Sequence, residues 1–244
     1  LTGKPGVCPV TAGPGSPNSM AGVAQAYGAA SPMIHIAGAV PLQADKEAFH
    51  GVDDPAFVHG MFAKITKWSA RVERIEDIPE VMAKAFHIAR SGRPGPVHVE
   101  LPRVSDYSEF ILQEAPAVLP AYRPLPTVCT SPDAACVERF AAATMAARAP
   151  VIAAGKGIIR QGAMAELAAL SVKLQAPVVV AQDAIGVIPE SHPFFAGHFQ
   201  QYRSHPLCIE ALKRTDLILG ISLKAGTAEL TALKANAPER NLLL

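Results

Sequence analysis

The chain has 244 residues, which is enough to bury a large core and to form two domains. Half of its residues are hydrophobic and 18% are charged, a globular composition that excludes a disordered protein. With 22 basic and 21 acidic residues the net charge is +1. It therefore lacks the basic excess of a nucleic-acid-binding protein, and small molecules and protein surfaces are the expected partners.

The first segment alternates strand and helix signals. Residues 7–12 predict a buried strand, residues 16–30 an Ala-rich helix and residues 32–38 a second strand. Two strands joined by a helix within about 30 residues form a βαβ unit, so we expect a parallel pair.

The first strand runs into the turn Gly13, Pro14 and Gly15. In α/β proteins such a turn presents backbone and small side chains to a ligand beyond the carboxyl end of a strand. The alternative is an ordinary tight turn, in which Gly supplies a positive φ, Pro fixes φ, and Asn18 caps the helix.

A long polar connection over residues 41–64 follows, and its length indicates a functional loop. It holds His50, the one histidine for which we favour a site role, and the turn-forming pair Asp53 and Asp54.

Three more elements complete this segment. Residues 66–72 predict a short extended stretch, residues 75–89 a helix with one apolar stripe, and residues 97–101 a strand of alternating polarity.

Prolines then crowd residues 106–130, which favours an extended linker between a domain over 1–105 and another over 131–244. The second domain is expected to begin with a helix capped by Ser131, with Pro132 at its first position. The predicted elements that follow are strands at 149–154, 177–182 and 216–221, a helix at 163–174, and the start of a further strand at 241–243.

This order predicts an α/β fold of two doubly wound, parallel-sheet, Rossmann-like domains, both expected to be incomplete. Because the chain does not begin with Met, we expect it to be part of a longer protein.

Other chemistries receive little support. The four cysteines form no C-x-x-C pair and are expected to be free thiols in a reducing compartment; they are Cys8, Cys129, Cys136 and Cys208. No histidine spacing suggests zinc, and a surface loop is expected around His192, His198 and His205. The glycines of residues 155–157 favour a structural turn over a nucleotide site. No signal peptide or apolar run of about 20 residues is evident, so we expect a cytoplasmic protein without a membrane span.

Several segments, in order, resemble the thiamine-diphosphate enzymes of the acetolactate synthase-like superfamily. Residues 3–18 resemble the middle of the pyrimidine-binding domain, residues 66–68 match a T-K-W segment, and residues 91–102 resemble the S-G-R-P-G-P-V…L-P signature. From about residue 131 the chain is similar to the central domain of that superfamily.

This resemblance implies roles for particular residues. Thr11, Pro14 and Asn18, with the flanking Gly13 and Gly15, would line the aminopyrimidine side of thiamine diphosphate. A flat ring needs close backbone approach, an apolar wall and a few polar groups. His50 falls near a Gln that many relatives place close to the cofactor and substrate. Arg93 matches an Arg that touches FAD in FAD-containing relatives, although their G-M-H-G segment is replaced by residues 197–200 here.

The resemblance also implies parts outside the chain. The catalytic Glu is expected upstream of Leu1, and the G-D-G…N segment that holds Mg²⁺ and the diphosphate after Leu244. The whole protein would be a homodimer or homotetramer that makes or breaks a C–C bond beside a carbonyl, with a 2-keto acid as substrate. The alternatives are a lyase or hydrolase like benzaldehyde lyase, oxalyl-CoA decarboxylase or the cyclohexanedione hydrolases, a module that binds FAD or another nucleotide, and a purely structural piece.

Overall fold

The computed structural model describes residues 4–41, 44–46, 49–102, 131–200, 203–224, 226–237 and 241–243. The chain divides into two compact units, residues 1–129 and 130–244. The predicted linker over 106–130 lies outside the described residues, so it stays a prediction.

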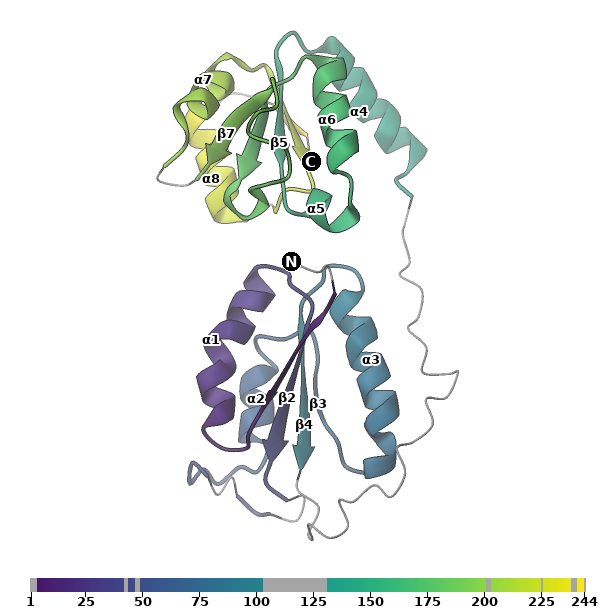
Figure 1. Cartoon of the computed structure of the whole chain (residues 1–244), viewed down its shortest axis with the longest axis vertical. Coiled ribbons are helices and arrows are strands. Elements are labelled where there is room, and N and C mark those ends of the chain that lie inside the picture. Colours follow the sequence, from purple (N-terminus) through teal and green to yellow (C-terminus); the bar gives the residue numbers. More distant parts are fainter. Residues whose placement is uncertain are drawn as a thin grey trace. The chain divides into compact units, whose positions relative to one another are not determined.

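Unit 1 is a βαβ-type domain whose order follows the sequence prediction closely (Figure 1). Its elements are β1 Gly6–Val10, α1 Gly15–Gly28, β2 Met33–Ala39, α2 Phe57–Phe62, β3 Ser69–Arg71, the 3₁₀ turn η1 Ile75–Asp77, α3 Ile78–Arg90 and β4 Pro96–Pro102. The four strands are parallel and pair in the order β1-β2-β4-β3.

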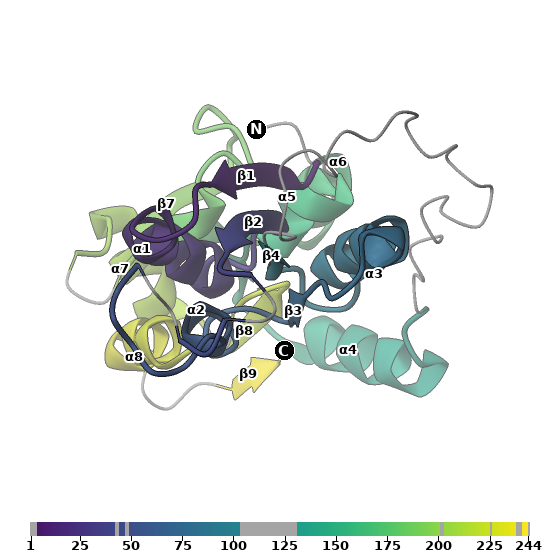
Figure 2. The same ribbon diagram turned by 90° about the horizontal axis from the view of Figure 1, so that it is seen from below.

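Helices cover both faces of this sheet, with α1 and α2 on one side and α3 on the other (Figure 2). On the α3 side, Ile34, Val97 and Val99 pack against the predicted apolar stripe of that helix. On the other side, Val23 of α1 packs with Val58 and Phe62 of α2. Strand side chains alternate between the two cores because successive residues point to opposite faces.

The predicted strand of alternating polarity is β4, and its polar residues are buried. His98 is 0% and Glu100 1% exposed. The strand lies between β2 and β3 and is covered on both faces, so its polar residues form part of the interior.

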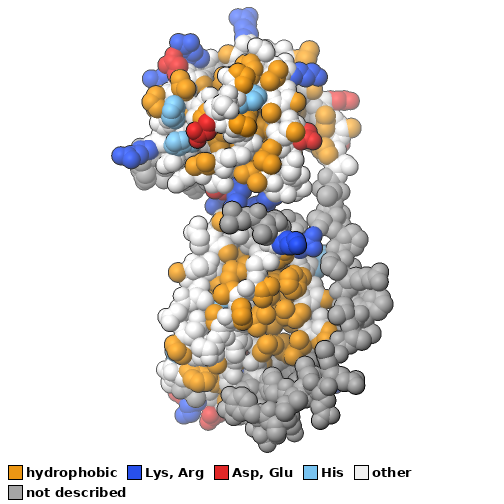
Figure 3. All heavy atoms as spheres, in the orientation of Figure 1, with side chains coloured by type: hydrophobic (Ala, Val, Ile, Leu, Met, Phe, Trp, Pro, Cys, Tyr) orange, Lys and Arg blue, Asp and Glu red, His pale blue; other side chains and the backbone are white. Residues whose placement is uncertain are grey.

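Strand β1 lies at the edge of the unit 1 sheet, and its side chains are exposed or half-buried. Val7 is 51% exposed there, and Figure 3 shows apolar side chains gathered on this face of the unit.

Unit 2 has a five-stranded parallel sheet in the order β7-β6-β5-β8-β9. Its elements are α4 Ala134–Ala146, β5 Pro150–Ala154, α5 Gly157–Gln161, α6 Met164–Leu174, β6 Val178–Ala181, the 3₁₀ turn η4 Gln182–Ala184, β7 Phe195–Phe199, α7 Pro206–Arg214, β8 Leu217–Ile221, α8 Thr227–Asn236 and β9 Asn241–Leu243. Helices α7 and α8 lie on one face, and α4 and α6 on the other (Figure 2). The two parallel sheets confirm the predicted α/β fold class.

Two predictions for unit 2 were wrong. The N-cap of α4 is Asp133, whose carboxylate accepts from the Ala135 N–H, and not Ser131. The expected surface loop around the three histidines contains β7, which includes His198, and ends at His205. His205 caps α7, since its Nδ1 accepts from the Leu207 N–H at 3.2 Å.

Candidate functional site

The turn after β1 lies at the carboxyl edge of the unit 1 sheet. Gly13 has φ +73°, a conformation that glycine adopts without strain, and its carbonyl accepts from the Ser16 N–H at 3.1 Å. The side chains of Thr11, Pro14 and Asn18 are all exposed. A hydroxyl, a proline ring and an amide therefore share one short surface segment.

The alternative role of Asn18 as a helix cap is wrong. Helix α1 begins at Gly15, with Pro14 at the N-cap position and no side-chain cap, so Asn18 lies within the first turn of the helix. Its amide is available for contacts outside the helix.

The long loop after β2 reaches this turn. A Cβ atom on Gly13 would lie 2.9 Å from Cγ of Phe49, so the aromatic ring packs directly on the glycine. Phe49 is nevertheless 57% exposed. His50 follows it, is also exposed, and has its ring 6.0 Å from that of Phe57.

The structure thus places the predicted turn residues on one short segment and packs Phe49, the residue before His50, on Gly13. Phe49 was not among the residues predicted from the sequence. The signal that could have identified it is an aromatic residue inside an otherwise polar loop. Phe49 and Pro14 supply apolar surface beside the polar groups of Thr11 and Asn18, the mixture that a flat heteroaromatic ligand requires.

Arg93 lies elsewhere. Its Nη2 donates to the carbonyl of Gly28 at 3.1 Å, and its guanidinium lies 5.8 Å from the ring centre of Tyr27. Both partners belong to the last turn of α1, while the glycine turn precedes the first. With 14 residues in α1, these ends are about 20 Å apart. The structure therefore does not bring Arg93 to the turn.

The T-K-W segment, residues 66–68, forms hydrogen bonds with the C-terminal ends of α2 and α3. The Thr66 hydroxyl donates to the carbonyl of Phe62 at 2.7 Å, and Lys67 Nζ donates to the carbonyls of Ile88 and Ser91 at the end of α3. A cation is favourable at a helix C-terminus. Burial, and then the charge of Arg93, lower the pKa of Lys67. Trp68 packs into the core under α3, so this segment has structural contacts of its own.

A chain of polar side chains runs through the core beneath the site. Ser19 Oγ lies 2.7 Å from His35 Nε2, and His35 Nδ1 lies 2.8 Å from His98 Nδ1. The phenyl ring of Phe62 stacks on both imidazoles, with centroids 4.5 and 4.4 Å away. Because His35 and His98 are direct partners in the β2–β4 register, the sheet itself sets this contact.

Counting hydrogens limits how this chain is protonated. The single Ser19 hydroxyl hydrogen has two acceptors within 2.7 Å, the Ser16 carbonyl and His35 Nε2. If it points to His35, then neutral His35 donates from Nδ1 to His98, and His98 carries its hydrogen on Nε2. That nitrogen faces Glu100 Oε1 at 3.9 Å, so this order directs a hydrogen toward the carboxylate.

Burial keeps both imidazoles from charging readily. It lowers the pKa of His35 to about 4, with nearby His98 as the second cause. Burial likewise lowers the pKa of His98, although the Glu100 carboxylate opposes the shift. Neutral histidines are therefore built into the folded unit, which supports the structural role expected for both.

Glu100 continues the chain to Arg71. Its Oε2 lies 3.9 Å from Arg71 Nε, and neither carboxylate oxygen accepts a hydrogen bond from any described residue. Arg71 also donates from Nη1 to the carbonyl of Pro55 at 2.8 Å and from Nη2 to that of Val40 at 3.1 Å. This guanidinium contacts the loop that carries Phe49.

In unit 2 the glycine turn after β5 packs against the end of β8. A Cβ on Gly155 would lie 2.1 Å from the carbonyl oxygen of Ser222, and one on Gly157 would lie 2.7 Å from Ser222 Cβ. Close backbone approach requires these glycines, as the structural-turn interpretation predicted. The carboxyl ends of β5 and β8 are also the switch point of this sheet, because the flanking connections run to opposite faces.

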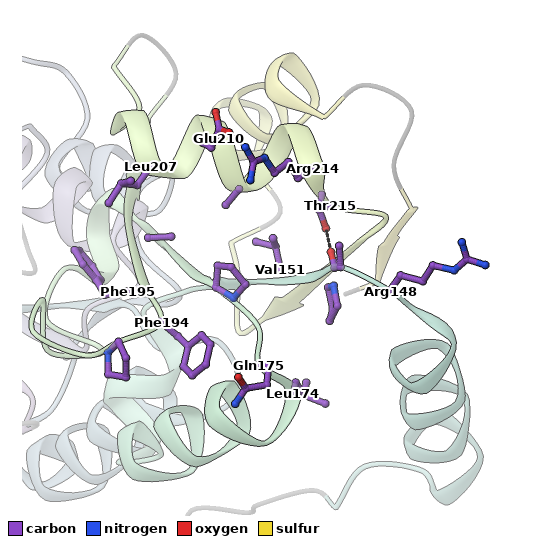
Figure 4. A pocket seen from close by; sticks show the side chains of 16 residues that line it. Arg148, Val151, Leu174, Gln175, Phe194, Phe195, Leu207, Glu210, Arg214 and Thr215 are labelled. Atoms are coloured by element: carbon purple, nitrogen blue, oxygen red, sulfur yellow. Dashed lines mark hydrogen bonds and ion pairs between the residues drawn. The ribbon is translucent and has the colours of Figure 1, made fainter.

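A cavity of about 590 Å³ opens at the other, amino edge of this sheet (Figure 4). Val151, Phe194 and Phe195 are among the apolar residues that line it. Of its polar groups, Thr215 donates to the Ala149 carbonyl and Arg214 pairs with Glu210 at 2.5 Å. These groups bond one another, so the cavity is a weaker candidate than the unit 1 edge.

The described residues lack two further features. No cluster of three or more His, Cys, Asp or Glu side chains that could hold a metal ion occurs among them. No described helix is long and apolar enough to cross a bilayer. Among the described cysteines, Cys8, Cys136 and Cys208 are free thiols, and Cys129 lies outside the described part.

Comparison with known proteins places these features in a family. Residues 1–59 match the thiamine pyrophosphate enzyme N-terminal TPP binding domain, and residues 137–241 match the thiamine pyrophosphate enzyme central domain. The chain therefore belongs to the thiamine pyrophosphate enzymes, as the resemblance predicted.

Within that family it is similar to acetolactate synthase large subunits. It is 32% identical over 247 residues to the probable acetolactate synthase large subunit of Methanocaldococcus jannaschii, covering 99% of this chain and 40% of that protein. It is 34% identical to the large subunit of Corynebacterium glutamicum over 223 residues, covering 91% of this chain and 34% of the relative. With isozyme 1 of Escherichia coli it is 36% identical over 201 residues, covering 80% and 33%. The chain thus spans at most about two fifths of the length of these relatives.

Proposed function

We propose that the chain is part of an enzyme that depends on thiamine diphosphate and Mg²⁺ and that makes or breaks a C–C bond beside a carbonyl. A 2-keto acid is the proposed substrate and an acetolactate synthase-like carboligation or decarboxylation the proposed reaction. The proposal includes a cytoplasmic homodimer or homotetramer in which Mg²⁺, the diphosphate and the catalytic Glu are held outside residues 1–244.

One observation carries this proposal. The exposed turn residues and the Phe49–His50 segment lie side by side at the carboxyl edge of a sheet in a unit that matches a TPP binding domain. Ligands of open α/β sheets bind beyond this edge.

The residues present fit the pyrimidine ring of the cofactor. Pro14 and Phe49 would supply apolar contacts, and the Thr11 hydroxyl and Asn18 amide would orient the ring nitrogens and amino group by hydrogen bonds. Gly13 and Gly15 allow the backbone to approach, and His50 would face the reacting end of the ligand. When bound, thiamine diphosphate supplies the carbanion chemistry, while this chain binds and orients it.

Calorimetric titration of the full-length protein with thiamine diphosphate and Mg²⁺ tests the proposal. Asn18→Leu should weaken binding roughly fivefold or more, the value of one hydrogen bond. Gln25→Leu is the matched control, because Gln25 is an exposed amide two turns further along the same helix. No binding by the unmodified protein, or equal weakening by both variants, would contradict it.

A FAD or nucleotide site in unit 2 is the second candidate. It is favoured by the switch point at β5 and β8, where Gly155 and Ser222 meet. A yellow protein whose flavin absorbance survives gel filtration would support a FAD site. A colourless protein that also binds no adenine nucleotide would exclude both forms of this candidate.

A further inference from the structure

The loop that carries Phe49 and His50 is held at its neck by one side chain. Val40 follows β2 at the start of this loop, and Pro55 lies just before α2 at its end. Arg71 donates to the carbonyl of each, from Nη2 at 3.1 Å and from Nη1 at 2.8 Å. A single guanidinium therefore joins two backbone positions that are fifteen residues apart in sequence.

The fork shape of arginine suits this task. Its planar head presents several N–H donors in fixed directions, whereas a lysine ammonium is a point charge on a flexible stem. Arg71 lies on β3, where it is the register partner of Glu100 on β4. The sheet therefore fixes the position from which the side chain reaches the loop.

Glu100 holds the guanidinium from behind. The carboxylate is 1% exposed and lies 3.9 Å from Arg71 Nε, whose side chain is 16% exposed. It is the buried anion closest to this cation among the described residues, and on its other side lies His98. Because a buried charge without a partner is costly, each group of the pair keeps the other in place.

The loop in turn meets the glycine turn. Phe49 packs on Gly13, and Asp54 and Ala56 form a side-chain turn in which the Ala56 N–H donates to Asp54 Oδ1 at 2.8 Å. The Phe57 N–H also donates to the Asp54 carbonyl at 3.1 Å. The neck that Arg71 closes is therefore directly connected to the segment facing the turn.

We propose that Arg71, backed by Glu100, is a positioning residue that holds residues 49–55 so that Phe49 packs on Gly13 and His50 lies next to this contact. Arg71 itself is not expected to touch the cofactor. The part of this proposal that concerns thiamine diphosphate rests on the proposed function above, while the part that concerns the loop does not.

Hydrogen exchange of the full-length protein tests the loop directly. In Arg71→Met, amides of residues 49–57 should exchange at least about tenfold faster, since two charge-assisted hydrogen bonds are lost. Arg71→Lys, which keeps the charge, should give an intermediate rate. Arg74→Met is the matched control, because Arg74 is a nearby exposed arginine whose side chain pairs only with exposed Glu76 in the described structure.

Amides of β2 and β4 serve as the internal standard and should stay protected in every variant. If the amides of β2 and β4 also exchange faster in Arg71→Met, that variant has loosened the whole unit, and Arg71→Lys is compared with the unmodified protein instead. In Arg71→Lys, faster exchange confined to residues 49–57 is expected. Exchange in the loop equal to that of Arg74→Met would overturn the proposal.

Cofactor affinity supplies the second readout. Thiamine diphosphate with Mg²⁺ should bind at least about tenfold more weakly to Arg71→Met than to Arg74→Met. A loosened loop with unchanged affinity would refute the positioning role. If the unmodified protein binds no thiamine diphosphate, the proposed function fails, and the exchange rates alone then decide whether Arg71 holds the loop.

Discussion

As the pH falls, unit 1 should lose stability at a higher pH than protonation of its carboxylates alone would cause, because His35 is buried in neutral form. Its pKa is lowered from the ordinary 6.5 to about 4, first by burial and then by His98. As the pH falls from 7 toward 4, the unfolded chain therefore binds a proton before the folded chain does. The contribution of neutral His35 to the free energy of unfolding is therefore complete above about pH 7 and is lost as the pH falls from 7 to 4.

The magnitude follows from the two pKa values. Between pH 7.5 and pH 5, His35 alone should remove about 2 kcal/mol from the free energy of unfolding, with a limit of about 3 kcal/mol below pH 4. The lowered pKa of His98 adds to the loss with the same sign. The charged neighbours on this face are Glu100 and Arg71, and His59 of α2 also disfavours protonation of His98.

The single tryptophan makes the assay specific for this unit. Trp68 is the one tryptophan of residues 1–244 and packs in the core under α3, so urea unfolding of the 244-residue chain followed by its fluorescence reports unit 1. His35→Gln should lower the stability at pH 7.5 but flatten its dependence on pH. Gln25→Leu, a substitution at an exposed position of α1, should leave that dependence unchanged. Stability that is level from pH 7.5 to 5, or an equal slope in His35→Gln, would refute the reasoning.

Two further predictions concern packing and reactivity. Gly13→Ala should destabilise unit 1 by about 1–2 kcal/mol for its left-handed backbone, plus the cost of displacing Phe49. Gly51→Ala is the control, because Gly51 also has a positive φ but an added Cβ there would meet no atom within 4 Å. If both variants lose the same free energy of unfolding in the urea assay, the contact between Phe49 and Gly13 does not contribute to stability. The second prediction concerns the cysteines: burial raises the pKa of Cys208 to about 12, whereas Cys136 is exposed. A thiol reagent at pH 8 should therefore label Cys136 and should not label Cys208 until the protein unfolds. Prompt labelling of Cys208 in the folded protein would contradict its burial.

The sequence predicted the repeating strand and helix order because buried parallel strands and amphipathic helices leave strong local patterns. It missed β7, in which Gly197 adopts φ +87° and the pairing with β6 shifts register between Val178 and Val180. Both irregularities depend on neighbours rather than on local propensity. Helix α2, at six residues, is too short to show a period.

For the candidate site, the turn could be predicted, since glycine and proline mark turns locally. The buried chain from Ser19 to Arg71 could not. Its members come from α1 and three strands and meet only through the register of the sheet. His98 and Glu100 have the alternating spacing of a solvated strand face, and only the covering helices make that face part of the core.

The most direct measurement of the central claim is a hydrogen-exchange footprint of thiamine diphosphate with Mg²⁺ on the full-length protein. If the carboxyl edge of unit 1 receives the pyrimidine ring, the cofactor should slow exchange in residues 11–18 and 49–57. Exchange in residues 91–95, which include Arg93 and lie at the opposite edge of the sheet, should not change. Two results at a saturating cofactor concentration would contradict the assignment of this edge as the cofactor site: protection confined to residues 91–95, or no protection in residues 11–18 and 49–57.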